Sequence, residues 1–179
     1  MIRRSGLLLG CLAFFSIAMA QERPITEGSA VLVAFPFNKG ERYNFVVFEQ
    51  ISGKRKCFDK NGTTPVVVDP LLLNFNWVGS CRRHGLEGVG LKINGKDESL
   101  QFGFVVRKVG NEIQMNSFRI VNRRMDLSTK KLIARTRGFV AGTMMELKLE
   151  PGFSLSRKQL SAKDTHYIFI NFQGRWKET

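Results

Sequence analysis

The sequence has few of the residues that bind metals or build catalytic dyads. It contains three cysteines and only two histidines, His84 and His166, in 179 residues. A protein metal site needs several converging His, Cys or carboxylate ligands, so we expect no metal site. The G-x-S-x-G elbow of serine hydrolases and the phosphate-cradling G-x-x-x-x-G-K-[ST] loop are also absent. We therefore expect no cofactor.

Acidic side chains are scarce. The chain has 15 aspartates and glutamates against 28 lysines and arginines, a formal net charge of +13. A surplus of this size attracts acidic partners and repels basic ones.

Long apolar runs are absent except at the start of the chain. Residues 7–17 are almost wholly apolar, follow Arg3 and Arg4, and precede Ala18-Met19-Ala20, a small-x-small cleavage site. The run is shorter than the roughly 20 residues of a membrane span, and no later stretch is long enough to replace it. We expect residues 1–20 to be a signal peptide. Leu8 to Cys11 resembles a bacterial lipoprotein box, which is the alternative.

Cleavage after Ala20 leaves a chain of 159 residues with 26 basic and 15 acidic side chains, a net charge of +11. That length is typical of one domain. We expect residues 21–29 to be a flexible lead-in and 30–179 to form a single β-rich domain. The product would be secreted or periplasmic, in the cell envelope, and without a membrane span. An exported protein rarely meets nucleic acid, so no nucleic-acid partner is expected.

Two cysteines remain after such cleavage, Cys57 and Cys81. An even count in an oxidising compartment predicts a disulfide between them. Two unpaired buried thiols are the alternative.

No sustained 3.6-residue periodicity is present, and short apolar runs alternate with turn residues. This pattern predicts an all-β antiparallel sandwich or barrel of about seven to nine strands. The candidate strands are 30–37, 42–51, 71–79, 88–94, 102–109, 112–120, 131–138, 143–149 and 165–172.

Three of these runs carry specific expectations. Alternation over 71–79 predicts a mostly buried central strand. Within 143–149, Met145, Leu147 and Leu149 should point toward the core. Gly110-Asn111 predicts a tight turn that joins two strands in a hairpin.

The segment from Cys57 to Cys81 carries the pattern C-F-x3-G-x2-P-x2-V-D-P-L-L-L-N-F, followed by G-x-C. It resembles an uncharacterised domain family of secreted cyanobacterial proteins. Looser similarity upstream at 43–50 and downstream at 135–138 and 149–153 extends the resemblance over nearly the whole chain after residue 20. The resemblance implies an exported single domain and supplies no activity.

Candidate catalytic residues are few, and we assign none. Glycoside hydrolysis needs two carboxylates about 5–9.5 Å apart, for which Asp69 and Glu49 are the weak alternatives. Asp69 precedes Pro70, where an aspartate commonly accepts backbone hydrogen bonds in a turn. We interpret His84 as part of a solvated turn and His166 as a half-buried strand residue.

Positive charge gives the one functional signal with named residues. Lys131, Arg135 and Arg137 would share one face if 131–138 is a regular strand, because alternate residues point the same way. With Arg123 and Arg124 they form a candidate polyanion-binding row. The alternative is a solvated basic surface without a ligand.

The leading hypothesis is a non-catalytic exported protein that binds an acidic polymer, a polysaccharide or lipopolysaccharide, or that has a structural role. Acidic polysaccharide and lipid headgroups are the expected partners. One alternative is an envelope-acting hydrolase with a carboxylate site. Another is a protein-binding module that uses an exposed sheet edge.

We predict that the exported protein begins at Gln21, because Ala18 and Ala20 fit the small-residue requirement of signal cleavage. Intact mass spectrometry of the exported protein measures this directly. A lipid-modified N-terminus at Cys11 would contradict it.

Overall fold

The computed structural model describes residues 22–160 and 166–178, so the expected signal peptide lies outside the described residues. Strands form most of this part of the chain. Its helical segments are three short 3-10 turns: η1 (Asn38–Gly40), η2 (Leu71–Asn74) and η3 (Leu86–Gly88). The expected all-β class is confirmed.

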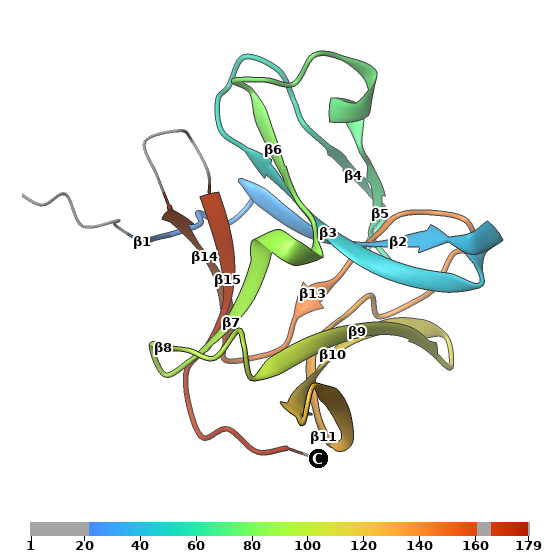
Figure 1. Cartoon of the computed structure of the whole chain (residues 1–179). Helices are drawn as coiled ribbons and strands as arrows, with labels where there is room; N and C mark the ends of the chain where they lie inside the picture. Colours follow the sequence, from blue (N-terminus) through green and yellow to red (C-terminus); the bar gives the residue numbers. More distant parts are fainter. Residues whose placement is uncertain (1–21, 161–165, 179) are drawn as a thin grey trace, which may run out of the picture.

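The strands form three hydrogen-bonded sheets that curl around a common interior (Figure 1). The six-stranded sheet has the order β4 (Asp59–Asn61), β5 (Val67–Asp69), β12 (Met145–Glu146), β2 (Ala30–Phe37), β3 (Arg42–Gln50) and β6 (Cys81–His84). The five-stranded sheet has the order β1 (Glu22–Pro24), β14 (Phe153–Gln159), β15 (His166–Phe172), β7 (Val89–Ile93) and β8 (Lys96–Asp97). The four-stranded sheet has the order β13 (Lys148–Leu149), β11 (Arg124–Arg135), β10 (Glu112–Val121) and β9 (Phe102–Val109). Among the described strands, β7 and β15 pair in parallel and the other pairs are antiparallel.

Strands β2 and β3 bury both of their faces. Leu32 and Ala34 point into the main core, where they meet residues of the other two sheets such as Ile168 and Ile113. Val31 and Val33 alternate with them and point to the opposite side. This central hairpin is apolar on both faces because each face is covered.

A second, smaller core fills the space between the outer face of β2 and β3 and the segment that runs from Cys57 to Cys81. Phe48, Val68 and Leu72 pack there beside the two half-cystines, which are bonded to each other. The expected disulfide is present. Because its loop closes over an otherwise exposed sheet face, the bond holds a cover in place.

The expected central strand over 71–79 is wrong. Leu71–Asn74 is the 3-10 turn η2, in which Leu72 is buried while Leu73 is exposed, and Val78 is also exposed. The backbone folds back at Gly79, whose φ of +76° favours glycine, and Cys81 N–H donates to the Trp77 carbonyl. A short apolar run flanked by Pro70 and Gly79 therefore forms a turn that inserts one leucine.

The other two specific expectations are confirmed. Met145 and Leu147 are buried in the main core and Leu149 packs against it, although this run changes sheets between β12 and β13. β9 and β10 form a hairpin through Gly110-Asn111, with Val109 opposite Glu112.

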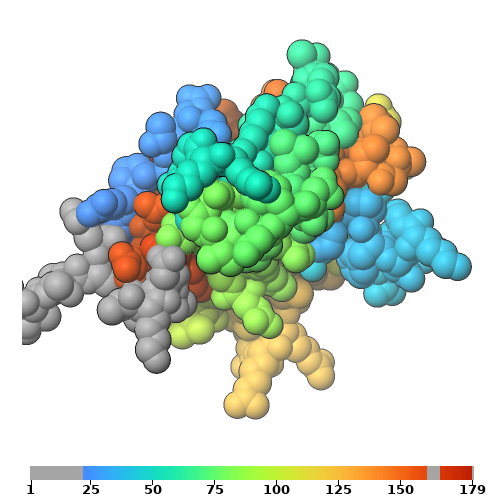
Figure 2. Space-filling view, turned by 90° about the horizontal axis from the view of Figure 1, so that it is seen from above, coloured from blue at the N-terminus to red at the C-terminus, as the bar shows by residue number. Residues whose placement is uncertain are grey.

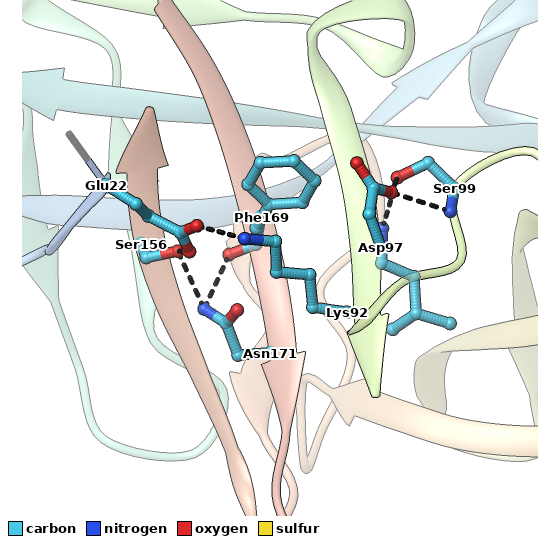
Figure 3. A network of polar contacts seen from close by, with 8 residues as sticks. Glu22, Lys92, Asp97, Ser99, Ser156, Phe169 and Asn171 are labelled. Carbon is cyan, nitrogen blue, oxygen red and sulfur yellow. Dashed lines mark hydrogen bonds and ion pairs between the residues drawn. The ribbon is translucent and has the colours of Figure 1, made fainter. Parts of the chain in front are cut away.

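The segment expected as a flexible lead-in contributes β1, which pairs with β14. Its Glu22 carboxylate contacts Lys92 and accepts a hydrogen bond from Ser156 (Figure 3). Asn171 Nδ2 donates to Ser156 Oγ at 2.9 Å, and the Lys92 ammonium lies 4.3 Å from the Phe169 ring centre. These contacts attach the first described residues to the face of the five-stranded sheet.

We predict that reducing the Cys57–Cys81 bond lowers the free energy of unfolding by about 3.5 kcal/mol, because the bond closes a loop of about 25 residues in the unfolded chain. Guanidinium titrations with and without dithiothreitol measure the difference. Peptide mapping without reduction should recover the two cysteines linked. Free alkylation of both thiols in the native protein would contradict the prediction.

Candidate functional site

The edge pairing of β3 with β6 brings three polar side chains to one face of the six-stranded sheet. Glu49 lies opposite Arg82, and Val47 lies opposite His84, in antiparallel register. Directly opposed residues project to the same face, and residues two apart on one strand do so as well. Glu49, Arg82 and His84 therefore project together toward the side that holds the main core.

Glu49 is the centre of this cluster. Its side chain is 2% exposed, and its Oε2 accepts a hydrogen bond from His84 Nε2 at 3.2 Å. Arg82 Nη1 lies 3.9 Å from the same oxygen. Arg157 reaches across from β14 in the five-stranded sheet and donates to Oε1. A buried carboxylate is tolerated only when it is paired in this way.

The cluster keeps Glu49 ionised. Burial by itself would raise the pKa of the carboxyl, but the hydrogen bond from His84 and the positive charge of Arg157 outweigh it, and the pKa lies below its ordinary value. Glu49 is therefore a fixed negative charge at neutral pH. It holds the neighbouring histidine and arginine side chains in position, and it is enclosed too fully to contact a ligand itself.

A pocket of about 270 Å³ lies beside the cluster, between β6 and the start of β15. Its polar lining consists of Arg82, Arg83, His84 and His166. Arg83 projects from the face of β6 opposite to Arg82 and His84, so the pocket lies around this edge strand. Its apolar lining includes Trp77, which is 37% exposed. None of the lining residues that the structure describes is acidic. The pocket thus combines positive or hydrogen-bonding groups with one aromatic ring, which suits an anionic ligand that also has an apolar face.

The interpretation of His84 as part of a solvated turn is wrong. It is 7% exposed and belongs to β6, because the chain after the disulfide returns to the sheet and pairs with β3. His166 is half-buried at the start of β15, as expected. The sequence signal for the cluster was Glu49 itself, an acid that directly follows the apolar run from Phe45 to Phe48.

Asp69 is not part of this site. It is exposed at the end of β5, which is separated from β3 by β12 and β2. Three strand spacings of about 4.8 Å put Asp69 and Glu49 on the order of 14 Å apart, beyond the separation of a glycosidase carboxylate pair. The structure therefore does not bring these two candidates together.

The five basic residues of the expected row are divided among three places. Arg123 and Arg124 lie at the turn between β10 and β11, while Arg135 ends β11, a strand of 12 residues. Arg137 follows the strand with a φ of +56°. Lys131 lies between the two ends of β11, with its ammonium 5.5 Å from the Phe172 ring centre.

The expected shared face of Lys131 and Arg135 is wrong because β11 is bulged. Lys131 pairs with Ser117 and Arg135 with Gln114, positions on opposite faces of β10. β10 itself keeps a continuous register with β9 across this region, so the extra residue belongs to β11. One inserted residue inverts the side-chain alternation.

Arg135 and Arg137 also lie beside acidic partners. Arg135 donates to both carboxylate oxygens of Glu150, at 2.7 and 3.0 Å, and its Nη1 lies 3.8 Å from Glu112. Arg137 lies 3.8 Å from Glu150 as well. The hydrogen bond from Arg135 holds the pKa of Glu150 below its ordinary value despite partial burial. This end of the row is a mixed-charge network.

Two further observations concern only the part of the chain that the structure describes. No three His, Cys, Asp or Glu side chains gather there as a metal-binding group. None of its helices has the length and apolar character needed to cross a membrane.

We predict that Glu49→Gln lowers the free energy of unfolding at pH 7 by about 1.5–3 kcal/mol, because it removes charge-assisted hydrogen bonds from His84 and Arg157, while Arg157, 29% exposed, stays partly solvated. The effect should depend on pH. The pKa of Glu49 is lower in the folded than in the unfolded protein, so its contribution is present above about pH 4.5 and is lost as pH falls further. Urea titrations between pH 3 and 7 should show a flatter acid limb for the variant.

The exposed Glu27 supplies the matched control, because Glu27→Gln makes the same chemical change without a buried partner. It should shift stability by less than about 0.5 kcal/mol. Equal effects of the two variants would show that the contacts of Glu49 with its basic partners do not stabilise the fold.

Comparison with known proteins gives a family and no activity. A family model described as "Protein of unknown function (DUF3747)" matches residues 8–173. No curated protein and no solved structure matches the chain. Because the family model covers nearly the whole chain, the protein belongs to the DUF3747 family of proteins of unknown function.

Proposed function

We propose that this protein is a non-catalytic, exported binding protein of the cell envelope or periplasm, and that its ligand is an acidic polymer such as a polysaccharide or lipopolysaccharide. The observation that carries the proposal is the pocket in which Trp77 lies among Arg82, Arg83, His84 and His166. One anionic sugar unit of the polymer occupies this pocket.

The lining supplies the two kinds of contact that an acidic sugar needs. Guanidinium groups offer paired donors that match a carboxylate, sulfate or phosphate. The face of an exposed Trp ring provides a flat apolar surface for the C–H face of a sugar ring. Arg83 is exposed at the rim and Trp77 is partly exposed, so both can reach a polymer that lies across the opening.

Glu49 acts as a positioning residue for this pocket. It holds His84 at 3.2 Å and Arg82 at 3.9 Å from the same oxygen. Fixed side chains lose less conformational entropy when a ligand binds, so the cluster supports affinity without contacting the ligand. The net charge of +11 that remains after cleavage behind Ala20 adds long-range attraction to an anionic polymer.

The pocket is favoured over the other candidate arrangements. A carboxylate hydrolase would need a second acid near Glu49, and Asp69 lies three strands away. A sheet-edge binding module would use the backbone of an outer strand such as β9, and it would give the basic and aromatic side chains of the pocket no role. The basic row is divided by the β11 bulge and partly neutralised by Glu150.

We predict that Arg83→Gln weakens binding to polygalacturonate about tenfold, the loss expected for one charge-assisted contact. Trp77→Ala should weaken it by a similar factor through loss of the aromatic surface. Binding of the unmodified protein should fall steeply between 0.05 and 0.5 M salt, and neutral dextran should not bind. Isothermal titration calorimetry measures the three proteins under the same conditions.

Arg42→Gln is the matched control, since Arg42 is also exposed and its loss changes the net charge by the same amount. It should change affinity less than twofold. The double variant Arg135→Gln with Arg137→Gln tests the row directly. If the row variant loses binding and Arg83→Gln does not, the pocket is the wrong site. Equal losses from Arg83 and Arg42 would mean that only overall charge matters.

A further inference from the structure

The tip of the β10–β11 hairpin, residues 119–127, is a surface separate from the pocket. Val121 pairs with Arg124 across a two-residue turn in which Asn122 and Arg123 both have positive φ, 50° and 63°. Two such residues in sequence make the turn type that matches the twist of a tight hairpin. Figure 2 shows gold-coloured residues of this region extending beyond the rest of that face.

A large bulge separates the hairpin tip from the remainder of β10 and β11. Ser117 pairs with Lys131, but Arg119 pairs with Asp126, so residues 127–130 lie opposite Phe118 alone. The bulge is held by its own hydrogen bonds. Asp126 Oδ1 accepts from Ser128 N at 3.0 Å, and Thr129 Oγ1 accepts from Arg119 N at 2.8 Å. The hairpin tip is therefore a shaped projection with internal support.

Apolar side chains are concentrated on the hairpin tip. Ile120, Val121, Met125 and Leu127 are each between 37% and 57% exposed. Scattered exposed apolar residues are normal, but here four lie within eight positions on one narrow projection. The paired Ile120 and Met125 share one face of the hairpin and Val121 projects from the other, so they form an apolar patch that wraps around the tip and that water solvates poorly. Such a patch indicates a surface that is covered in function.

The same tip carries positive charge. Arg123 and Arg124 lie at the turn itself, and both are exposed. The one acid in residues 119–127 is Asp126, whose carboxylate is hydrogen-bonded within the bulge by Ser128 N and Oγ. An occupant of this surface must therefore supply negative charge next to apolar material.

A pocket at the base of the hairpin tip extends the apolar surface. Its volume is about 430 Å³, and Ile120, Met125 and Arg123 line it together with Phe102 and Phe104. Its floor includes Gly103, where an added Cβ would lie 3.1 Å from the Met125 sulfur. Glu87 is the acid among its lining residues. The pocket therefore continues the apolar surface of the tip from Arg123 toward Phe102 and Phe104.

From these observations we infer that the hairpin tip docks on an acidic lipid surface. The apolar side chains enter the boundary between headgroups and acyl chains, and Arg123 and Arg124 contact the anionic headgroups. A lipid interface supplies both negative charge and an apolar phase to a narrow projection. A polysaccharide supplies the charge without the apolar phase, which leaves Leu127 and Val121 unexplained.

The test is co-sedimentation with vesicles of phosphatidylglycerol and phosphatidylcholine, compared with phosphatidylcholine alone. The double variant Val121→Asp with Leu127→Asp should bind the acidic vesicles at least about tenfold more weakly than the unmodified protein. The matched control, Val109→Asp with Val140→Asp, changes two similarly exposed apolar residues outside the tip by the same charge and should retain most of the binding. Residues 7–17 would bind lipid wherever they are retained, so all proteins are compared with one N-terminus, verified by intact mass.

A second pair of variants tests the charge. Arg123→Asn keeps a residue that tolerates positive φ, and with Arg124→Gln it should weaken binding to acidic vesicles several-fold. The exposed pair Arg42→Gln with Lys54→Gln is its control. Equal losses from tip and control variants overturn the proposal, as does equal binding to neutral vesicles. If the unmodified protein does not bind vesicles and the Val121 and Leu127 variant changes the oligomeric state, the tip is a contact between copies of the chain instead.

Discussion

The ion pair between Glu49 and Arg157 joins two sheets at the point where the main core ends and solvent begins. Glu49 belongs to the six-stranded sheet and Arg157 to the five-stranded sheet, so their contact fixes the distance between β3 and β14 at that edge. His84 and Arg82 share the same carboxylate, and through them the position of the pocket wall depends on it. A charge that is costly to bury is retained where it sets the relative position of several elements, a role for which apolar residues lack the directionality.

The central hairpin of β2 and β3 gives the molecule its layered character. Each strand sends alternate side chains into two separate cores, the larger shared with the other sheets and the smaller covered by the segment from Cys57 to Cys81. A substitution that shifts the backbone of β2 or β3 in one core therefore also displaces the side chains that the same strands place in the other core. β6 adds to this hairpin at its edge, and it carries both Cys81 and His84. The candidate binding pocket thus draws on residues that depend on both cores.

Sequence reasoning recovered the class of the fold, the disulfide and several strands because these follow from local alternation and from residue counts. It failed where three-dimensional context reverses a local pattern. The apolar run 71–79 alternates like a strand, yet Pro70, Gly79 and the disulfide make it a cover with one buried leucine. One bulged residue in β11 separates Lys131 from Arg135, and no single-sequence pattern marks that insertion. Glu49 was a candidate, but its partners came from two strands distant in sequence, β6 and β14, and neither strand was foreseen.

The disulfide has a consequence for the binding activity proposed above. Trp77 lies four residues before Cys81, in the turn that the bond holds against β3. In a reducing compartment the cover over the smaller core would be attached by packing alone, and the aromatic wall of the pocket would lose its fixed position. Under the proposed function, oxidation would act as a maturation step, and the chain would be a weak binder wherever its thiols stay reduced. Such a protein would bind polyanions weakly at its site of synthesis and would acquire its affinity only in an oxidising environment.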